Sequence, residues 1–140
     1  MELIVRDKKI FELDHFNNYI FHSDCGTLYR CDYTDRSNVV VENKVTDIKI
    51  LKDTIVISKY DNGIEIAAIH TDSLRKRTLI KSADVEHLFA NPENAYADCI
   101  MSFEYHEGKL LAVLKEDKRR FMVAINILTA ETDVIGEWSF

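Results

Sequence analysis

The feature that most constrains this chain is an internal repeat with a spacing of 37 residues. The segments Asp24-Cys25-Gly26 and Thr34-Asp35 recur as Asp61-Asn62-Gly63 and Thr71-Asp72, each time between runs of alternating apolar residues. A third, less regular copy extends over residues 109–135. Apolar alternation with a period of two is typical of half-buried strands, and a repeated unit predicts a stack of similar supersecondary elements. The sequence therefore predicts an all-β fold made of three antiparallel units.

Each unit is predicted to contain four strands, because its runs of β-branched and aromatic residues are bounded by short polar breaks. The predicted strands of the first unit are Ile10–Leu13, Tyr19–His22, Thr27–Tyr33 and Val39–Val41. Those of the second unit are Asp47–Leu51, Thr54–Lys59, Ile64–His70 and Arg77–Ile80. Those of the third unit are Cys99–Tyr105, Lys109–Leu114, Phe121–Leu128 and Thr132–Trp138. A chain of 140 residues with 46% hydrophobic content is expected to form one domain, 1–140, with units at about 1–43, 44–81 and 97–140.

The turns between these strands have recognisable chemistry. Asp61-Asn62-Gly63 supplies residues that tolerate positive φ and predicts a tight type I′ hairpin, with Asp24-Cys25-Gly26 as a looser version. Glu107-Gly108 is expected to form a similar hairpin turn between the first and second strands of the third unit. The Thr-Asp pairs at 34–35 and 71–72 are expected between the third and fourth strands, where their side chains bond backbone amides two residues on. We therefore interpret the repeated acids as turn residues.

One segment, the insertion 82–96, departs from the β pattern. Val85, Leu88 and Phe89 follow a possible N-cap at Ser82 with helical spacing, which predicts a short helix that ends before Asn91-Pro92. Long insertions in repeat folds often map to the binding face. The insertion is therefore the first candidate for a recognition loop.

Composition narrows the class of partner and the compartment. A net charge of −6 argues against nucleic acid and against anionic membrane surfaces. No apolar stretch approaches the roughly 20 residues that a membrane-spanning helix needs, and the first residues do not have the pattern of a signal peptide. Cys25, Cys31 and Cys99 have no metal-binding or redox spacing, which favours a reducing cytoplasm.

No motif points to standard catalytic chemistry. The five histidines show no metal-ligand spacing, and the chain has no nucleophile elbow, phosphate-binding loop or dinucleotide fingerprint. The sequence thus predicts no catalytic residue, no metal and no cofactor. Binding candidates are the acidic and histidine cluster of the insertion and the aromatic residues around it or near the end of the chain, and core packing is the favoured competing interpretation of Phe89. They are Asp84, Glu86, His87, Phe89, Tyr96, Asp98 and Trp138.

A family resemblance rests on the first two units. The first unit reads Tyr19-Ile20-Phe21-His22-Ser23, Gly26-Thr27-Leu28-Tyr29-Arg30-Cys31-Asp32 and Asp35-Arg36-Ser37-Asn38, and the second begins with residues 45–58. Over residues 10–81 this pattern resembles the blades of a bacterial β-propeller family of unknown function that is similar to the YWTD blades of the low-density-lipoprotein receptor. Arg36 stands where that family prefers Gly, and the third unit lacks the Leu-Tyr and Asp-Gly-Ser elements.

The resemblance implies a half-propeller, because three blades are present where the family normally closes six. Three blades leave an apolar face at each end of the stack. We therefore expect a homodimer in which two half-propellers complete a six-bladed ring. An antiparallel barrel or sandwich and an open three-blade stack are the alternatives.

Three functions are compatible with these features. The first is a non-enzymatic module that binds a protein or another macromolecule through loops of the insertion and of the hairpin turns. The second is a small hydrolase or lyase in which acids from several blades, such as Asp47, Asp98 and Glu104, converge on a channel. The third is a structural subunit of an assembly. Absence of catalytic motifs favours the first.

Overall fold

The computed structural model describes residues 10–14, 19–32, 34–51, 53–102 and 109–139. They form three separate four-stranded antiparallel sheets, so the predicted all-β fold of three four-stranded units is confirmed and the strands do not close into a single barrel. The strands of blade 1 are β1 (Ile10–Asp14), β2 (Tyr19–Asp24), β3 (Thr27–Asp32) and β4 (Asn38–Glu42). Those of blade 2 are β5 (Val45–Leu51), β6 (Thr54–Tyr60), β7 (Ile64–His70) and β8 (Lys76–Lys81). Those of blade 3 are β9 (Tyr96–Ser102), β10 (Lys109–Glu116), β11 (Arg119–Asn126) and β12 (Thr132–Ser139).

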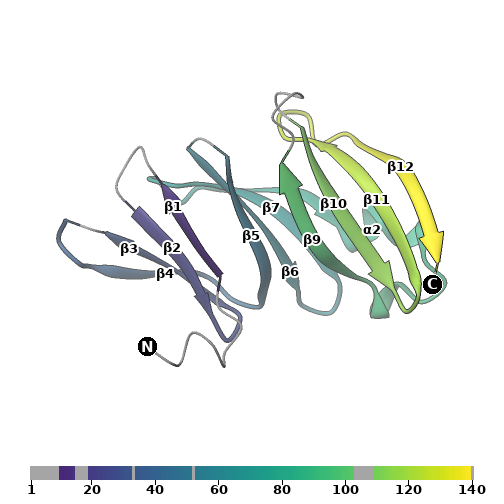
Figure 1. Ribbon diagram of the computed structural model, residues 1–140, viewed down its shortest axis with the longest axis horizontal. Helices are drawn as coiled ribbons and strands as arrows, with labels where there is room; N and C mark the ends of the chain where they lie inside the picture. The colour runs from purple at the N-terminus through teal and green to yellow at the C-terminus, as the bar shows by residue number, and fades with distance from the viewer. Residues whose placement is uncertain (1–9, 15–18, 33, 52, 103–108, 140) are drawn as a thin grey trace.

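The three sheets stand side by side like the blades of a fan (Figure 1). Within each blade the strand order follows the sequence, and consecutive strands pair antiparallel. The first strands of the blades, β1, β5 and β9, are neighbours in space. This is the arrangement of a propeller, in which the first strand of each blade lies nearest the axis.

Two hydrophobic cores hold the blades together, one on each face of blade 2. Ile55 and Ile57 of β6 belong to the core shared with blade 1, which includes the fully buried Phe21 and Leu28. The intervening Val56 belongs to the larger core shared with blade 3. Successive side chains of a strand point to opposite faces, so blade 2 needs apolar residues at nearly every position. This explains why its strands have continuous apolar runs.

The turn between the third and fourth strands is the same in all three blades. Its first residue, Asp32, His70 or Asn126, accepts a side-chain hydrogen bond from the amide two residues on, at 2.8, 3.2 and 2.9 Å. The backbone carbonyl of that residue accepts from the amide four residues on. The residue four positions on has positive φ in each case, and these residues are Arg36, Leu74 and Ala130. Of the predicted Thr-Asp contacts, Asp35 binds the Ser37 amide at 2.8 Å, whereas His70 supplies the acceptor in blade 2.

This turn yields a first prediction, on Arg36. A residue with a side chain at φ 61° is strained relative to Gly, so Arg36→Gly should stabilise the fold by about 0.5–1 kcal/mol. Urea unfolding of the variant beside Ser37→Gly provides the measurement. Ser37 does not have positive φ, so its replacement should destabilise. A loss of stability in Arg36→Gly would contradict the turn geometry.

The hairpins between the second and third strands differ from the prediction. Cys25 and Gly26, with φ of 51° and 84°, form the tight two-residue turn, since Asp24 pairs directly with Thr27. In blade 2 the paired residues are Tyr60 and Ile64, so Asp61-Asn62-Gly63 forms a wider three-residue loop. The expected tight and loose turns are thus exchanged. Positive φ at Asn62 and Gly63 is confirmed.

The insertion is more compact than the predicted helix. It contains one helical turn, α2 (Ser82–Val85), followed by the 3-10 turns η1 (Glu86–Leu88) and η2 (Pro92–Asn94). The N-cap is Lys81 rather than Ser82, and Asp84 accepts the Lys81 amide at 2.8 Å. Blade 3 then begins at Tyr96, earlier than the predicted Cys99. The insertion therefore ends at residue 95 and folds as a chain of short turns.

Candidate functional site

One end of the fold gathers most of the sequence candidates. We call it the loop face: it carries the turns 25–26, 61–63 and 117–118 and the segment 82–95, and it runs along the lower edge of Figure 1. These turns lie at one end because all three hairpins run in the same direction and the connections into β5 and β9 start beside them. The opposite end carries the turns of the Asp32, His70 and Asn126 type.

Hydrogen bonds between blades join the parts of the loop face. The Val45 amide donates to the Gly26 carbonyl at 2.7 Å, and the Tyr60 amide donates to the Lys44 carbonyl at 3.1 Å. The Lys44 ammonium lies 2.8 Å from the Asp61 carboxylate. Contacts of this kind link blade 1 to blade 2, so the loop face forms a continuous surface rather than a set of independent loops.

Glu116 fixes the insertion to blade 3. Its side chain is 6% exposed, and its carboxylate accepts hydrogen bonds from the amides of Ala90 and Asn91. A buried carboxylate is tolerated only when it is hydrogen-bonded, and here the donors are backbone groups of the insertion. Tyr60 adds a second contact, because its hydroxyl donates to the Glu93 carbonyl. Sequence reasoning missed Glu116, because its donors lie 25 and 26 residues earlier and carry no side-chain signal.

The structure divides the insertion candidates into structural and exposed residues. Phe89 is 8% exposed and packs edge-to-face on Phe121 with ring centres 5.3 Å apart, so it lies in the core. Asp84 is exposed but caps α2 through the Lys81 amide. Glu86 and His87 are exposed on η1. These two residues are therefore the part of the predicted cluster that faces solvent.

The remaining candidates lie on blade 3. Tyr96 begins β9 and Trp138 lies near the end of β12, both half-buried at the loop-face end. Asp98 is in β9, but its side chain lies outside the described part of the structure. Glu104, from the proposed catalytic trio, also lies outside the described residues. Asp47 is half-buried, and its carboxylate accepts the Ile48 amide at 3.0 Å.

A row of side chains crosses blade 3 and joins the two aromatic candidates. Strand register places Tyr96 opposite Lys115, Lys115 opposite Arg120 and Arg120 opposite Trp138. The Lys115 ammonium lies 5.8 Å from the centre of the Tyr96 ring. Cations over aromatic faces are attracted by the ring quadrupole. We call these four residues the cation–aromatic row.

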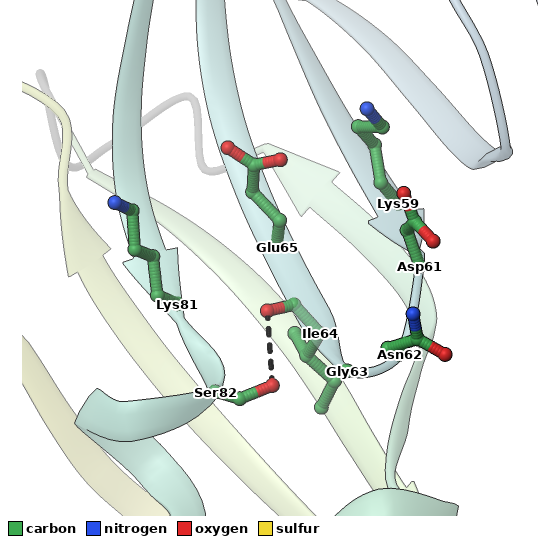
Figure 2. Close-up of a pocket in the computed structure, with 8 residues that line it drawn as sticks. All are labelled: Lys59, Asp61, Asn62, Gly63, Ile64, Glu65, Lys81 and Ser82. Atoms are coloured by element: carbon green, nitrogen blue, oxygen red, sulfur yellow. Dashed lines mark hydrogen bonds between the residues drawn. The ribbon is translucent and has the colours of Figure 1, made fainter.

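Two hollows open on the loop face near blade 2. The first, of about 370 Å³, is lined by charged and small residues and is shown in Figure 2. Ser82 lies against Gly63 there and donates to the Ile64 carbonyl at 3.4 Å, while Lys59 and Asp61 lie on the opposite side of the hollow (Figure 2). The second, of about 260 Å³, is lined by Thr46, Tyr60, Asn94 and Tyr96. It lies at the start of the inner strands β5 and β9.

A third hollow, of about 570 Å³, lies beside Glu116. It is bounded by the insertion at Asn91 and Asn94 and by the β10–β11 turn from Asp117 to Arg119. Arg119 binds Glu137 at 3.1 Å and stacks 5.0 Å from the centre of the Phe121 ring. The insertion thus contributes lining residues to all three hollows.

The opposite end contains a polar cluster between blades 1 and 2. The Arg30 guanidinium donates to the carbonyls of Thr71 and Asp72 at 2.9 and 2.6 Å and lies 4.1 Å from the centre of the Tyr19 ring. The Tyr19 hydroxyl donates to the Asp72 carboxylate at 2.8 Å, which raises the pKa of Tyr19 above its usual value. These contacts orient the turn of blade 2 against blade 1. They explain the second Thr-Asp pair in structural terms.

An ion cluster joins β4 of blade 1 to β6, β7 and β8 of blade 2. Glu42 binds Lys59 at 2.7 Å and Lys76 at 3.3 Å, and Lys76 also binds Glu65 at 3.1 Å. Partial burial opposes ionisation of Glu42, but the two ammonium groups outweigh it and hold its pKa below the usual 4.5. Burial likewise opposes the charged form of Lys76, and the two carboxylates raise its pKa above 10.5.

This cluster predicts a defined pH dependence. Because the pKa of Glu42 is depressed on folding, its contribution is present above pH 4.5 and is lost as the pH falls through the folded-state value. We expect Glu42→Gln to lower the melting temperature at pH 7, and we expect this difference from the parent protein to shrink as the pH falls below 4.5. The exposed Glu131→Gln is the control. Melting scans over pH 3–7 that show a constant difference would contradict this role.

Within the described residues, no helix is long and apolar enough to cross a membrane. In the same part of the chain, no three His, Cys, Asp or Glu side chains come together as metal ligands.

Comparison with solved structures places the fold. A chain in a nidogen–laminin complex, an LDL-receptor-type propeller, matches 93% of this chain at 10% identity with a TM-score of 0.53. A luciferin-regenerating enzyme matches 89% at 12% identity with a TM-score of 0.59. The β-propeller domain of the trilobed protease from Pyrococcus furiosus, described as having an open velcro topology, matches 94% at 12% identity with a TM-score of 0.50.

These similarities concern the fold. The chain spans between 38% and 62% of the length of the three structures. No family model matches the sequence. No curated protein matches it significantly. The chain therefore has a propeller-like fold of three blades.

Proposed function

We propose that this protein is a binding module that recognises a macromolecular partner, most simply a protein, through its loop face. One observation carries the proposal: the insertion, which is the longest break in the β pattern, is fixed by Glu116 and Tyr60 as part of a continuous surface. A recognition surface has to be held in shape before it binds, because ordering a loop on binding costs affinity. The insertion meets this requirement.

The side chains of this surface suit a protein partner. Glu86, His87 and Asn94 are exposed, and Tyr60 and Tyr96 line the adjacent hollow of about 260 Å³. Tyrosine gives a large contact area with a polar tip and is enriched in protein interfaces. The exposed acids of the insertion and the net charge of −6 disfavour nucleic acid. Cys25 and Cys31 are thiols rather than disulfide partners, which supports a cytoplasmic location.

Matched charge reversals on the two ends of the fold test this function. Glu86→Lys changes the loop face, and Glu131→Lys makes the same change in an exposed turn at the opposite end. Quantitative affinity purification from cells of origin should recover proteins that the loop-face variant loses at least fivefold and the control variant retains. Equal recovery with both variants, or equal loss, would exclude the loop face as the recognition surface.

A further inference from the structure

The three blades are stacked in the same orientation, so every contact between blades joins unlike faces. In blade 2, Ile57 and Ala67 pack toward blade 1, whereas Val56 and Ile66 pack toward blade 3. The chain forms this type of contact twice. It leaves one face of blade 1 and one face of blade 3 turned away from blade 2, and we call these two surfaces the outer faces.

The outer face of blade 1 is apolar and aromatic. Strand register groups Ile20 with Cys31, and His22 with Tyr29 and Val40, on the side opposite the buried Phe21 and Leu28. The His22 and Tyr29 rings are stacked with centres 5.2 Å apart. Val40 is 57% exposed, a large apolar side chain at a solvent-facing position. This face has the composition of an interface core rather than of a solvated sheet.

The outer face of blade 3 is also apolar in its middle. Leu110, Ala112 and Leu114 pack toward blade 2, so alternation places Leu111 and Val113 on the outer side of the sheet, where they are already buried within the chain at 7% and 6% exposure. Register adds Met122 beside Val113 and Ala124 beside Leu111. The cation–aromatic row crosses the same face at its loop-face end. The result is an apolar sheet surface with a basic and aromatic border.

The charges of the two outer faces are complementary in sign and in position. Asp24 ends β2 on the outer face of blade 1 at the loop-face end, the same end at which blade 3 carries Lys115 and Arg120. Residues 10–42 include six acidic and only two basic side chains. The acids at the equivalent hairpin position in blades 2 and 3 are Asp61 and Glu116. Each binds the connection that leads into its own blade, at Lys44 and at residues 90–91 respectively. An acid at this position is thus a recurring interface residue.

We propose that the outer face of blade 1 packs against the outer face of blade 3 of a second copy of this chain. A two-fold axis repeats the contact and closes a six-bladed ring, with both loop faces on one side. Asp24 of each copy then faces the cation–aromatic row of the other, and Val40 packs against the half-buried Met122 and Ala124. Two such contacts are expected to bury more than the roughly 1,600 Å² of a standard specific interface. This inference concerns the outer faces rather than the loop face, and Tyr96 lies at the border between the two surfaces.

A charge exchange tests the pairing of faces. The first variant carries Asp24→Lys, and the second carries Lys115→Glu together with Arg120→Glu. Each variant alone places like charges at both junctions and should raise the dimer dissociation constant at least tenfold. An equimolar mixture of the two variants restores opposite charges at both junctions and should form the mixed dimer. Native mass spectrometry and sedimentation equilibrium read the outcome, because the dimer has twice the mass of the 16.3 kDa chain.

Two further variants complete the experiment. Lys81→Glu with Lys118→Glu changes the net charge equally on exposed loop-face positions and should leave the dimer intact. Val40→Asp changes a side chain that is exposed in the single chain, so the variant should fold normally. Its dimer dissociation constant should rise at least tenfold. A parent protein that stays at 16.3 kDa at about 100 μM overturns the proposal. A dimer indifferent to these changes, absence of the mixed dimer, or open-ended oligomers would overturn it as well.

Discussion

Replacement of Phe89 by Ala is expected to lower the free energy of unfolding by about 3–4 kcal/mol. From the sequence, Phe89 is a candidate both for binding and for the core. The structure places its ring in the core, edge-to-face with Phe121. Truncation removes buried apolar area and leaves a cavity between the insertion and blade 3. Urea denaturation monitored by circular dichroism measures the loss.

The control for this prediction is His87→Ala, two residues earlier on the same segment. His87 is exposed, so its replacement should change stability by less than about 0.5 kcal/mol. If both variants lose little, the insertion is not packed as described. Replacement of the whole insertion by a short Gly-Ser link should then also be harmless, whereas burial of Val85, Phe89 and Ala95 predicts a steep fall in melting temperature.

Gly63→Ala is expected to cost about 2–4 kcal/mol, for two separable reasons. The backbone at Gly63 has φ of +148°, a conformation that residues with side chains rarely adopt. A Cβ atom there would also lie 2.0 Å from the Ser82 hydroxyl oxygen and 3.1 Å from its Cβ, as the close approach in Figure 2 shows. One part of the cost is therefore strain and the other is a clash with the insertion.

A double-mutant cycle separates the two parts. Ser82→Ala removes the clashing hydroxyl, so Gly63→Ala should cost less in that background, with a coupling energy of about 1 kcal/mol. Cys25→Ser serves as the control in the equivalent hairpin, because Cys25 is exposed and its replacement should be nearly neutral. Strict additivity of Gly63→Ala and Ser82→Ala would show that the hairpin does not contact the insertion.

The strands could be predicted from the sequence because their signal is local. Alternation in β2, β3 and β11 marks one face as buried, and the order of hairpins follows from the turns between them. Errors occur where two signals compete. At Asp61-Asn62-Gly63 the sequence predicts a tight turn, but the Tyr60 amide binds the Lys44 carbonyl of the preceding connection and the loop widens by one residue.

The repeated turn after β3, β7 and β11 was only partly predictable. Asp32, His70 and Asn126 perform the same acceptor role with three different side chains, so no identity appears in the sequence. What the three turns share is a residue with positive φ four positions after the acceptor. These residues are not Gly, so the sequence does not reveal their conformation. The Arg36 departure from the resembled family thus preserves the turn geometry at a cost in strain.

The loop face depends on contacts that no local pattern encodes. Glu116 is buried and bonded to the insertion only because blade 3 packs against residues 82–95. The same packing forms the hollow lined by Tyr60 and Tyr96. The sequence correctly singled out the segment but could not separate its core residues from its exposed ones. That separation leaves Glu86 and His87 as the solvent-facing part of the predicted cluster.

Site-specific photo-crosslinking tests the proposed interaction surface most directly. A photoreactive phenylalanine derivative is introduced at His87 on the loop face, and in a separate chain at Ser73, which is exposed at the opposite end. After irradiation in cells of origin, we expect discrete crosslinked partners from position 87 that are absent from position 73 and that disappear when Glu86→Lys is added. Equivalent crosslinks from both positions, or none from position 87 and discrete ones from position 73, would contradict it.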